Sequence, residues 1–144
     1  MSKAIITGGA GFIGSNLTSY FLDKGWEVLV IDDYSTGKRE NLPEDKKLEI
    51  AETSIVDKAK MQQLIKDADV VFHMAVQCVR KSIRDPWLVH DVNSTGTLSV
   101  LDAAFVNKIP KFVYISSSEI YGSAITVPMD EEHPRNPTTV YGAS

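Results

Sequence analysis

The 144-residue sequence has little cysteine, no surplus of basic charge and no long apolar run. Its single cysteine, Cys78, cannot form an internal disulfide, and we expect an unreactive thiol in a reducing cytoplasm. Fifteen Lys and Arg against nineteen Asp and Glu leave a net charge of −4, which disfavours nucleic-acid binding through phosphate contacts. No segment approaches the roughly 20 apolar residues that span a bilayer. The N-terminal apolar run is also too short for a signal peptide. We therefore expect neither a membrane nor a nucleic acid as partner.

The sequence does contain short apolar runs that alternate with amphipathic segments. The runs predict five strands, at residues 4–6, 27–31, 48–50, 70–72 and 112–115. Helical spacing predicts one helical face from Ile13, Leu17, Tyr20 and Phe21, and a second from Met61, Leu64, Ile65 and Ala68. Strands without polar alternation are buried on both sides. We therefore predict an α/β fold, a doubly wound parallel sheet of Rossmann type, as one domain over residues 1–144.

Two further segments are predicted in the second half of the chain. A long helix is predicted from Pro86 to Asn107, with Gly96 letting another backbone approach closely. Its inward residues are Val92, Leu98, Leu101 and Phe105. Residues 122–139 are rich in Pro, Thr and acidic side chains and predict a loop, in which the acidic run 130–132 is solvated.

Three glycines follow the first predicted strand, at Gly8, Gly11 and Gly14. Glycines in this pattern allow a tight turn, close approach of a pyrophosphate and close packing of helix on strand. The following helix directs free N–H groups at an anion. Asp32 lies 18 residues after Gly14, at the end of the second strand, where a carboxylate accepts both ribose hydroxyls of an adenosine and repels a 2′-phosphate. The pattern predicts NAD rather than NADP, a preference that the nearby basic pair 38–39 could weaken.

Seven spaced motifs run through the chain in one order. They are Gly8-x-x-Gly11-x-x-Gly14, Asp32 with Ser35-Thr36-Gly37, His73-Met74-Ala75, Asp85-Pro86, Val92-Asn93-x-x-Gly96-Thr97, Ser116-Ser117-Ser118-x-x-Tyr121-Gly122 and Tyr141-Gly142-Ala143-Ser144. Together they resemble the extended short-chain dehydrogenase/reductase family, and more narrowly its NAD-dependent nucleotide-sugar epimerases, dehydratases and decarboxylases. The resemblance covers the whole chain.

The resemblance implies NAD as the cofactor and a set of residues that bind it. Besides the glycines and Asp32, the set comprises Phe12, Ile13, Ser35, Thr36, Gly37, Ser54, Ile55, Met74, Ala75, Val76, Asn93 and Tyr141. Many family members carry an acidic residue in place of Ser54, so the adenine contact is weaker or made differently here. Asn93 is implied to make a backbone or water contact near the nicotinamide ribose. We expect no metal, and His73 is expected to bond nearby backbone, because no Cys or second His stands at ligand spacing.

The reactive part resembles the family's Ser/Thr-Tyr-Lys arrangement. The resemblance implies Tyr141 as the catalytic tyrosine and Ser117 as the catalytic hydroxyl. Oxidation of a sugar C4 hydroxyl needs a base for the O–H proton, and a nearby lysine ammonium and the positive nicotinamide both favour a phenolate. In the family the lysine stands four positions after the tyrosine, whereas this sequence ends three positions after it. We expect an N-terminal portion that lacks the substrate domain.

The substrate implied is a nucleotide-diphosphate sugar, with a UDP-sugar preferred. Val79-x-x-Ser82 resembles an epimerase motif whose serine lies near the sugar, and Ser118 and Glu119 are further candidate substrate residues. The leading interpretation is a 4-epimerase, which returns the hydride to the other face of the sugar. A decarboxylase or 4,6-dehydratase stays open, although Ser118 stands where dehydratases carry an aspartate. An NAD-binding module without turnover is a further alternative that stays open. Family members commonly pair through helices, which makes a homodimer a further expectation.

Overall fold

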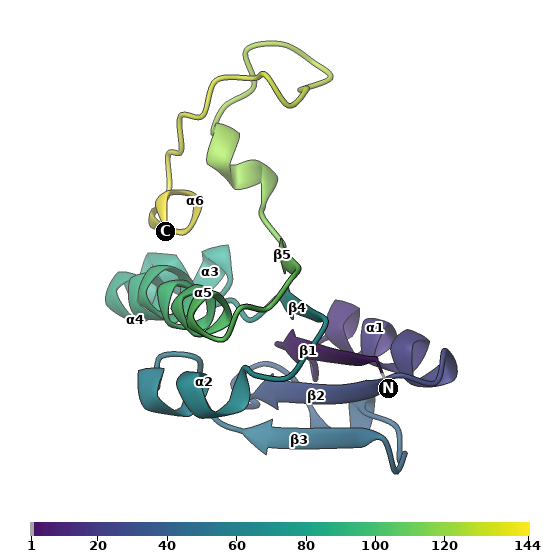
Figure 1. Cartoon of the computed structure of the whole chain (residues 1–144). Coiled ribbons are helices and arrows are strands. Elements are labelled where there is room, and N and C mark those ends of the chain that lie inside the picture. The colour runs from purple at the N-terminus through teal and green to yellow at the C-terminus, as the bar shows by residue number, and fades with distance from the viewer. Residues whose placement is uncertain (1) are drawn as a thin grey trace.

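Five parallel strands form the sheet of the computed structural model, which describes residues 2–144 (Figure 1). They are β1 (Lys3–Thr7), β2 (Glu27–Asp32), β3 (Leu48–Glu52), β4 (Val70–His73) and β5 (Phe112–Tyr114). Their spatial order is β3-β2-β1-β4-β5, and every neighbouring pair is parallel. The predicted α/β fold with five parallel strands is confirmed. Because the chain winds outward from β1 to β3 and then returns to β4, the strand order reverses at β1.

Helices cover both faces of this sheet. Helix α1 (Phe12–Asp23) packs on one face, and α2 (Lys58–Leu64) and α5 (Thr97–Val106) pack on the other (Figure 1). The shorter helical segments are η1 (Arg39–Asn41), α3 (Val79–Arg84), α4 (Pro86–His90), η2 (Asp91–Gly96), η3 (Ser118–Tyr121) and α6 (Val140–Ala143). Within residues 2–144, no helix has the length and apolar character needed to cross a membrane.

Alternate residues of the central strands supply two separate hydrophobic cores. Ile5 of β1 points into the core beneath α2 and α5, whereas Ile6 points into the core beneath α1, and both are fully buried. Full burial of an isoleucine contributes about 1.5–3 kcal/mol. The unbroken apolar runs of the sequence therefore serve both faces of the sheet, which is the reason that they lack polar alternation.

The segment predicted as one helix from Pro86 to Asn107 is built differently. It consists of α4, the π-helical η2 and α5 in succession. The predicted inward positions of Leu98, Leu101 and Phe105 are wrong, because all three are exposed, Phe105 by 82%. Val92 is buried as predicted. The buried positions 92, 93, 96, 99, 100, 103 and 104 recur every three or four residues through η2 and α5, so 98, 101 and 105 fall on the opposite face.

Mostly small side chains face the sheet from α5. The buried residues of α5 are Ser99, Val100, Ala103 and Ala104. Gly96 faces Ile55, whose Cδ1 and Cγ1 lie 2.7 Å from the position that a Cβ would take. The prediction that Gly96 admits another backbone is therefore wrong, because it is a side chain that approaches.

Helix α1 also packs through small residues. Of the predicted face, Leu17 and Phe21 pack against the core, whereas Ile13 and Tyr20 are mostly exposed. The buried residues of α1 are Gly14, Ser15, Thr18 and Leu22. The second predicted helical face is shorter than expected, since α2 ends at Leu64.

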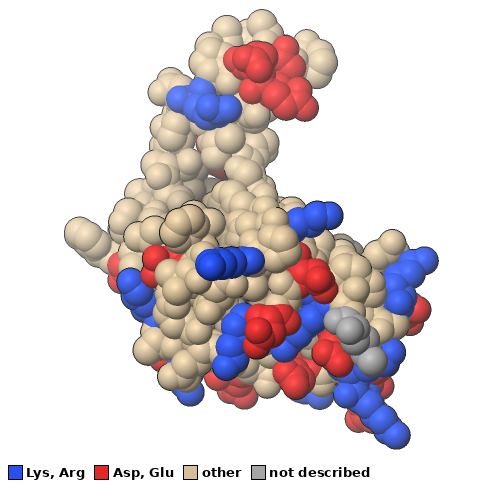
Figure 2. Space-filling model, in the orientation of Figure 1, with Lys and Arg blue, Asp and Glu red and all other residues tan. Residues whose placement is uncertain are grey.

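Residues 122–139 contain neither a helix nor a strand, as predicted, and they project from the sheet (Figure 1). Figure 2 shows acidic side chains gathered at the tip of this projection, apart from the mixed charges of the main body. The acidic residues at the tip are Asp130, Glu131 and Glu132, all exposed. The prediction of a solvated acidic run is confirmed.

Candidate functional site

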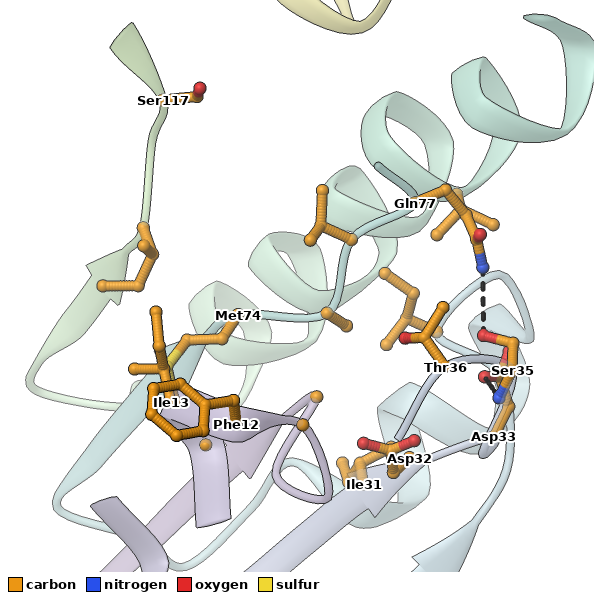
Figure 3. Close-up of a pocket in the computed structure, with 18 of the residues that line it drawn as sticks. Phe12, Ile13, Ile31, Asp32, Asp33, Ser35, Thr36, Met74, Gln77 and Ser117 are labelled. Carbon is orange, nitrogen blue, oxygen red and sulfur yellow. Dashed lines mark hydrogen bonds between the residues drawn. The ribbon is translucent and has the colours of Figure 1, made fainter. Parts of the chain in front are cut away.

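A cleft of about 450 Å³ lies at the carboxyl ends of the strands, where the strand order reverses (Figure 3). Ligands of doubly wound sheets bind at such a reversal. The cleft gathers the glycine turn after β1, the loops after β2, β3 and β4, and the segment after β5. Most predicted cofactor residues line it, namely Gly8, Gly11, Phe12, Ile13, Gly14, Asp32, Ser35, Thr36, Ile55, Met74, Ala75, Val76 and Tyr141.

The glycine turn between β1 and α1 leaves no room for side chains at two positions. Gly8 has a φ of +69°, and a Cβ there would lie 2.7 Å from the backbone nitrogen of Ala75. A Cβ on Gly14 would collide with the carbonyl oxygen of Gly8. A Cβ on Gly11 would meet only Gly8 O, at 3.3 Å. The turn thus presses against the loop after β4 and brings the start of α1 to the cleft.

Asp32 ends β2 with its carboxylate turned to the glycine turn. Oδ2 accepts a hydrogen bond from Ala10 N at 2.9 Å, and Oδ1 accepts one from Tyr34 N at 2.9 Å. The side chain is buried and lines the cleft (Figure 3). A carboxylate has about four lone-pair sites, so each oxygen can still accept a ligand hydroxyl.

Buried polar contacts hold the loop after β4. His73 bonds the hydroxyls of Thr7 and Thr97, through Nδ1 at 2.6 Å and Nε2 at 2.8 Å. The expected bond to nearby backbone is therefore wrong, because two threonine side chains lie closer. Burial lowers the pKa of His73 to about 4, so the ring is neutral near pH 7.

Gln77, which no sequence motif predicts as a site residue, links two sides of the cleft. Its Nε2 donates to Ser35 Oγ at 3.0 Å, a bond that joins the loop after β4 to the loop after β2 (Figure 3). Asn93 Oδ1 accepts from Gln77 N at 2.8 Å, and Asn93 Nδ2 donates to Gln77 O at 3.1 Å. Asn93 thus makes the expected backbone contact, from behind the loop, and does not line the cleft.

Ser117 and Tyr141 also line the cleft. Both also line an adjoining cavity of about 160 Å³. Ser117 Oγ accepts from Glu119 N at 3.3 Å and begins η3. Thr139 Oγ1 accepts from Gly142 N at 2.9 Å and begins α6, which carries Tyr141. Gly142 lies so close to the carbonyl of Glu119 that a Cβ would be 2.5 Å from its oxygen, so α6 packs directly on η3.

Several predicted residues lie outside the cleft. Gly37 packs against Ala10, and Ser54 precedes the cleft residue Ile55 without lining it. Of the three substrate candidates, Ser82 is buried in α3 and donates to Val79 O at 2.7 Å. Ser118 and Glu119 lie in η3 and line neither of these two cavities.

Seven cleft residues were not singled out as binding residues in the sequence. They are Ile31, Asp33, Thr53, Gln77, Val92, Ile115 and Ser116. All but Val92 follow or end strands, so adjacency to a predicted strand end is the signal that could have found them. Val92 lies in η2, one residue before Asn93.

The described residues fit a dinucleotide. The glycine turn forms a cradle that a Cβ at Gly8 or Gly14 would fill, and the buried carboxylate of Asp32 lies beside it. Helix N–H groups and a strand-end carboxylate are the donor and acceptor sets that a pyrophosphate and a ribose require. Among residues 2–144, no three His, Cys, Asp or Glu side chains gather in a way that could hold a metal ion. Fold and cleft together define a dinucleotide-binding domain of Rossmann type.

The chain belongs to the NAD dependent epimerase/dehydratase family, whose model matches residues 4–144. NAD is the cofactor of that family. The chain is 36% identical to the UDP-glucose 4-epimerase of Mycolicibacterium smegmatis over 148 residues, which cover 98% of this chain and 47% of that protein. It is 35% identical over 144 residues to the UDP-N-acetyl-alpha-D-glucosaminuronate decarboxylase of Bacillus cytotoxicus, covering 99% of this chain and 43% of that protein.

Solved structures show the same fold. The Bordetella bronchiseptica enzyme WbmH in complex with NAD+ matches with a TM-score of 0.94 and 37% identity, over 99% of this chain and 49% of that one. The chain thus spans about half the length of the relatives it matches. It is a member of a family of nucleotide-sugar enzymes that includes epimerases and decarboxylases.

Proposed function

We propose that the chain is the cofactor-binding portion of an NAD-dependent nucleotide-sugar 4-epimerase. One observation carries the proposal: Ser117 and Tyr141 line the same cleft as the glycine turn and Asp32. A hydroxyl and a phenol thus share one cleft with the residues that we propose to bind the dinucleotide. The 4-epimerase among the relatives supports the choice of reaction.

The chain's own residues have separate tasks in this reaction. Asp32 accepts the adenosine ribose hydroxyls, and the N–H groups at the start of α1 face the pyrophosphate. Tyr141 takes the proton of the sugar C4 hydroxyl, and Ser117 hydrogen-bonds the same oxygen and holds it in place. Bound NAD would supply the redox chemistry, as the acceptor and later the donor of the hydride. The substrate is a nucleotide-diphosphate sugar, with a UDP-sugar favoured by the names of the relatives.

Decarboxylation and dehydration are the competing outcomes, because the family begins all three reactions with the same oxidation. The relatives include a decarboxylase at nearly the same identity as the epimerase. Incubation of the full-length protein with UDP-galactose and, separately, with a UDP-uronate, followed by analysis of the sugar products, decides between them. Formation of UDP-glucose supports the epimerase, whereas loss of CO₂ from a UDP-uronate or of water from a hexose contradicts it.

Replacement of the phenol tests the assignment of Tyr141. In the full-length protein, Tyr141→Phe should lower kcat by at least about a hundredfold while NAD stays bound, because a general base contributes about 10²–10⁴-fold. Tyr121→Phe is the matched control, since Tyr121 packs on His133 and lines neither cavity. Activity retained in Tyr141→Phe would contradict its role as base.

The 144-residue chain should bind NAD+ without converting a sugar. This part of the proposal rests on the cleft, which is lined by this chain, and on the relatives, which are about twice as long. Isothermal titration should show NAD+ binding, and an epimerisation assay with UDP-glucose should show no product. Measurable epimerisation would overturn it.

The low cysteine content supports a reducing cytoplasm as the compartment.

An exposed apolar stripe on α5 supports the proposed homodimer. Leu98, Leu101 and Phe105 recur at helical spacing and are exposed, as is Trp87 on the preceding α4. Large exposed apolar patches mark interaction sites. Leu98→Glu should therefore convert a dimer of the full-length protein to a monomer in sedimentation velocity. Ser123→Glu, which makes the same change of charge at an exposed position of the projecting segment, should leave a dimer. A monomeric wild type would contradict the expectation.

A further inference from the structure

His73, the last residue of β4, is a buried titratable side chain to which the proposed reaction gives no role. Only 1% of its surface is exposed, and the Tyr114 ring stacks on it with 5.7 Å between ring centroids. The ring is neutral near pH 7, because burial lowers the pKa of His73 to about 4. A neutral imidazole has one nitrogen that donates and one that accepts.

The hydroxyl of Thr7 decides which nitrogen accepts. Thr7 Oγ1 accepts hydrogen bonds from the backbone N–H groups of Met74 and Ala75, at 3.2 Å each, and the Met74 N–H is shared with the backbone oxygen of Thr7 at 3.1 Å. A hydroxyl oxygen has two lone pairs and one hydrogen, so the hydrogen remains for His73 Nδ1, 2.6 Å away. Nδ1 is therefore the acceptor. Nε2 carries the ring hydrogen and donates it to Thr97 Oγ1 at 2.8 Å.

This hydrogen-bonded chain ends at the wall of the cofactor cleft. Thr7 is the last residue of β1 and directly precedes Gly8. The backbone nitrogen of Ala75 lies 2.7 Å from the position of a Cβ on Gly8, so the loop after β4 rests on the glycine turn. Gly8, Met74 and Ala75 all line the cleft. The Thr7 hydroxyl thus ties together two walls of the cleft.

We propose that His73 is a positioning residue of the cofactor cleft, whose Nε2–H tautomer directs the Thr7 hydroxyl so that both its lone pairs hold the loop after β4. The opposite tautomer would present a third hydrogen to the two lone pairs of Thr7 Oγ1, which would have to release one of the two backbone N–H groups. The Met74 N–H would keep the backbone oxygen of Thr7 as its acceptor, so Ala75 is the residue whose N–H depends on this hydroxyl. The inference rests on the proposed function, because it takes NAD as the occupant of the cleft.

A merely structural role predicts a different outcome from a positioning role. If the bonds from His73 to β1 and α5 only held the fold together, their removal would lower the free energy of unfolding and leave the NAD+ dissociation constant unchanged. A positioning role changes the dissociation constant itself, because the loop after β4 must be returned to its place when the cofactor binds.

The decisive comparison is NAD+ binding by the 144-residue chain and its threonine variants, measured by isothermal titration alongside urea unfolding. Thr7→Val removes the shared acceptor and should weaken NAD+ binding by about tenfold, whereas Thr7→Ser should stay within about twofold. Thr18→Val is the matched control, because Thr18 is fully buried and its hydroxyl has no hydrogen-bond partner. Its NAD+ affinity should equal that of the wild type. Thr7→Val with wild-type affinity would overturn the proposal.

Two further measurements keep the outcome clear. The ¹⁵N signals of the His73 ring in the wild type should show Nε2 protonated and Nδ1 unprotonated, and the opposite pattern would overturn the assignment. This signature needs no cofactor, so a wild-type chain that fails to bind NAD+ counts against the proposed function alone. If Thr7→Val does not fold, His73→Asn replaces it, because Asn keeps an acceptor near Nδ1. His73→Asn should bind NAD+ about tenfold more tightly than His73→Leu, and equal affinities would overturn the proposal.

Discussion

The side-chain amide of Asn93 holds the backbone of Gln77 through both of its polar groups. Asn93 Oδ1 accepts from Gln77 N at 2.8 Å, and Asn93 Nδ2 donates to Gln77 O at 3.1 Å. Both residues are buried. With its backbone fixed in this way, Gln77 reaches Ser35 on the far side of the cleft. Asn93 therefore shapes the cleft without lining it.

Removal of this amide should loosen the cleft. Asn93→Ala leaves two buried backbone groups of Gln77 without partners, which should lower the free energy of unfolding by about 2 kcal/mol and weaken NAD+ binding severalfold. Asn107→Ala is the control, since Asn107 donates one bond to Ala103 O at the end of α5. Urea unfolding and titration measure both effects. Unchanged NAD+ affinity in Asn93→Ala would show that the contact only stabilises the fold.

Loss of the Asp32 carboxylate should weaken NAD+ binding by about tenfold or more, because it removes the acceptor for the ribose hydroxyls. Asp32→Ala also leaves the N–H groups of Ala10 and Tyr34 without their acceptor. Asp45→Ala controls for the second loss, because Asp45 accepts the N–H two residues later, from Lys47 at 2.7 Å, as Asp32 does from Tyr34. Equal NAD+ affinities for the two variants would show that Asp32 has no part in ribose binding.

A side chain at Gly8 should abolish cofactor binding. Gly8→Ala combines a φ of +69° with a Cβ that would lie 2.7 Å from Ala75 N, so the turn and the loop after β4 must separate. Gly25→Ala shares the strain, with a φ of +82°, but its Cβ would meet only Lys47 Nζ, at 3.7 Å. We expect Gly25→Ala to cost about 1–2 kcal/mol of stability and to keep NAD+ affinity. NAD+ binding by Gly8→Ala that is as tight as that by Gly25→Ala would contradict the proposal that the glycine turn holds the cofactor.

Burial of His73 should make the chain less stable in mild acid. Its pKa of about 4 in the folded chain lies below the ordinary value of 6.5, so the unfolded chain binds more protons between these two pH values. The contribution is fully present above pH 6.5, and roughly 3 kcal/mol is lost as the pH falls to about 4. The difference in unfolding free energy between the wild type and His73→Leu, measured across this range, isolates it. A difference independent of pH would show that the folded-state pKa is not lowered.

Most of the fold could be predicted because local sequence determines it. Strands buried on both faces leave apolar runs such as 27–31, and the glycines at 8, 11 and 14 leave a turn that few other residues allow. Both signals depend on neighbours in the sequence alone. The exposed faces of α5 could not be predicted in this way. The apolar stripe that includes Leu98 and Phe105 has helical spacing, yet smaller residues of α5 such as Ala103 face the sheet, so periodicity alone selects the wrong face.

The candidate site shows the same division. Asp32 and Tyr141 stand in motifs with fixed spacing, so the sequence predicts them, and both line the cleft. Gln77 reaches the cleft because Asn93, 16 residues later, holds its backbone. The partners of His73 are likewise distant in sequence, since Thr7 is 66 residues away. Contacts of this kind follow from the pairing of β1 with β4, which no local pattern encodes.

The most direct test of the account compares NAD+ with NADP+ in isothermal titrations of the 144-residue chain. If the buried carboxylate of Asp32 accepts the ribose hydroxyls and repels a 2′-phosphate, as we propose, the chain should bind one NAD+ and should bind NADP+ at least about tenfold more weakly. Asp32→Ala should remove that preference by weakening NAD+ alone. Failure of the wild-type chain to bind NAD+, or equal affinity for the two cofactors, would contradict the assignment of this cleft.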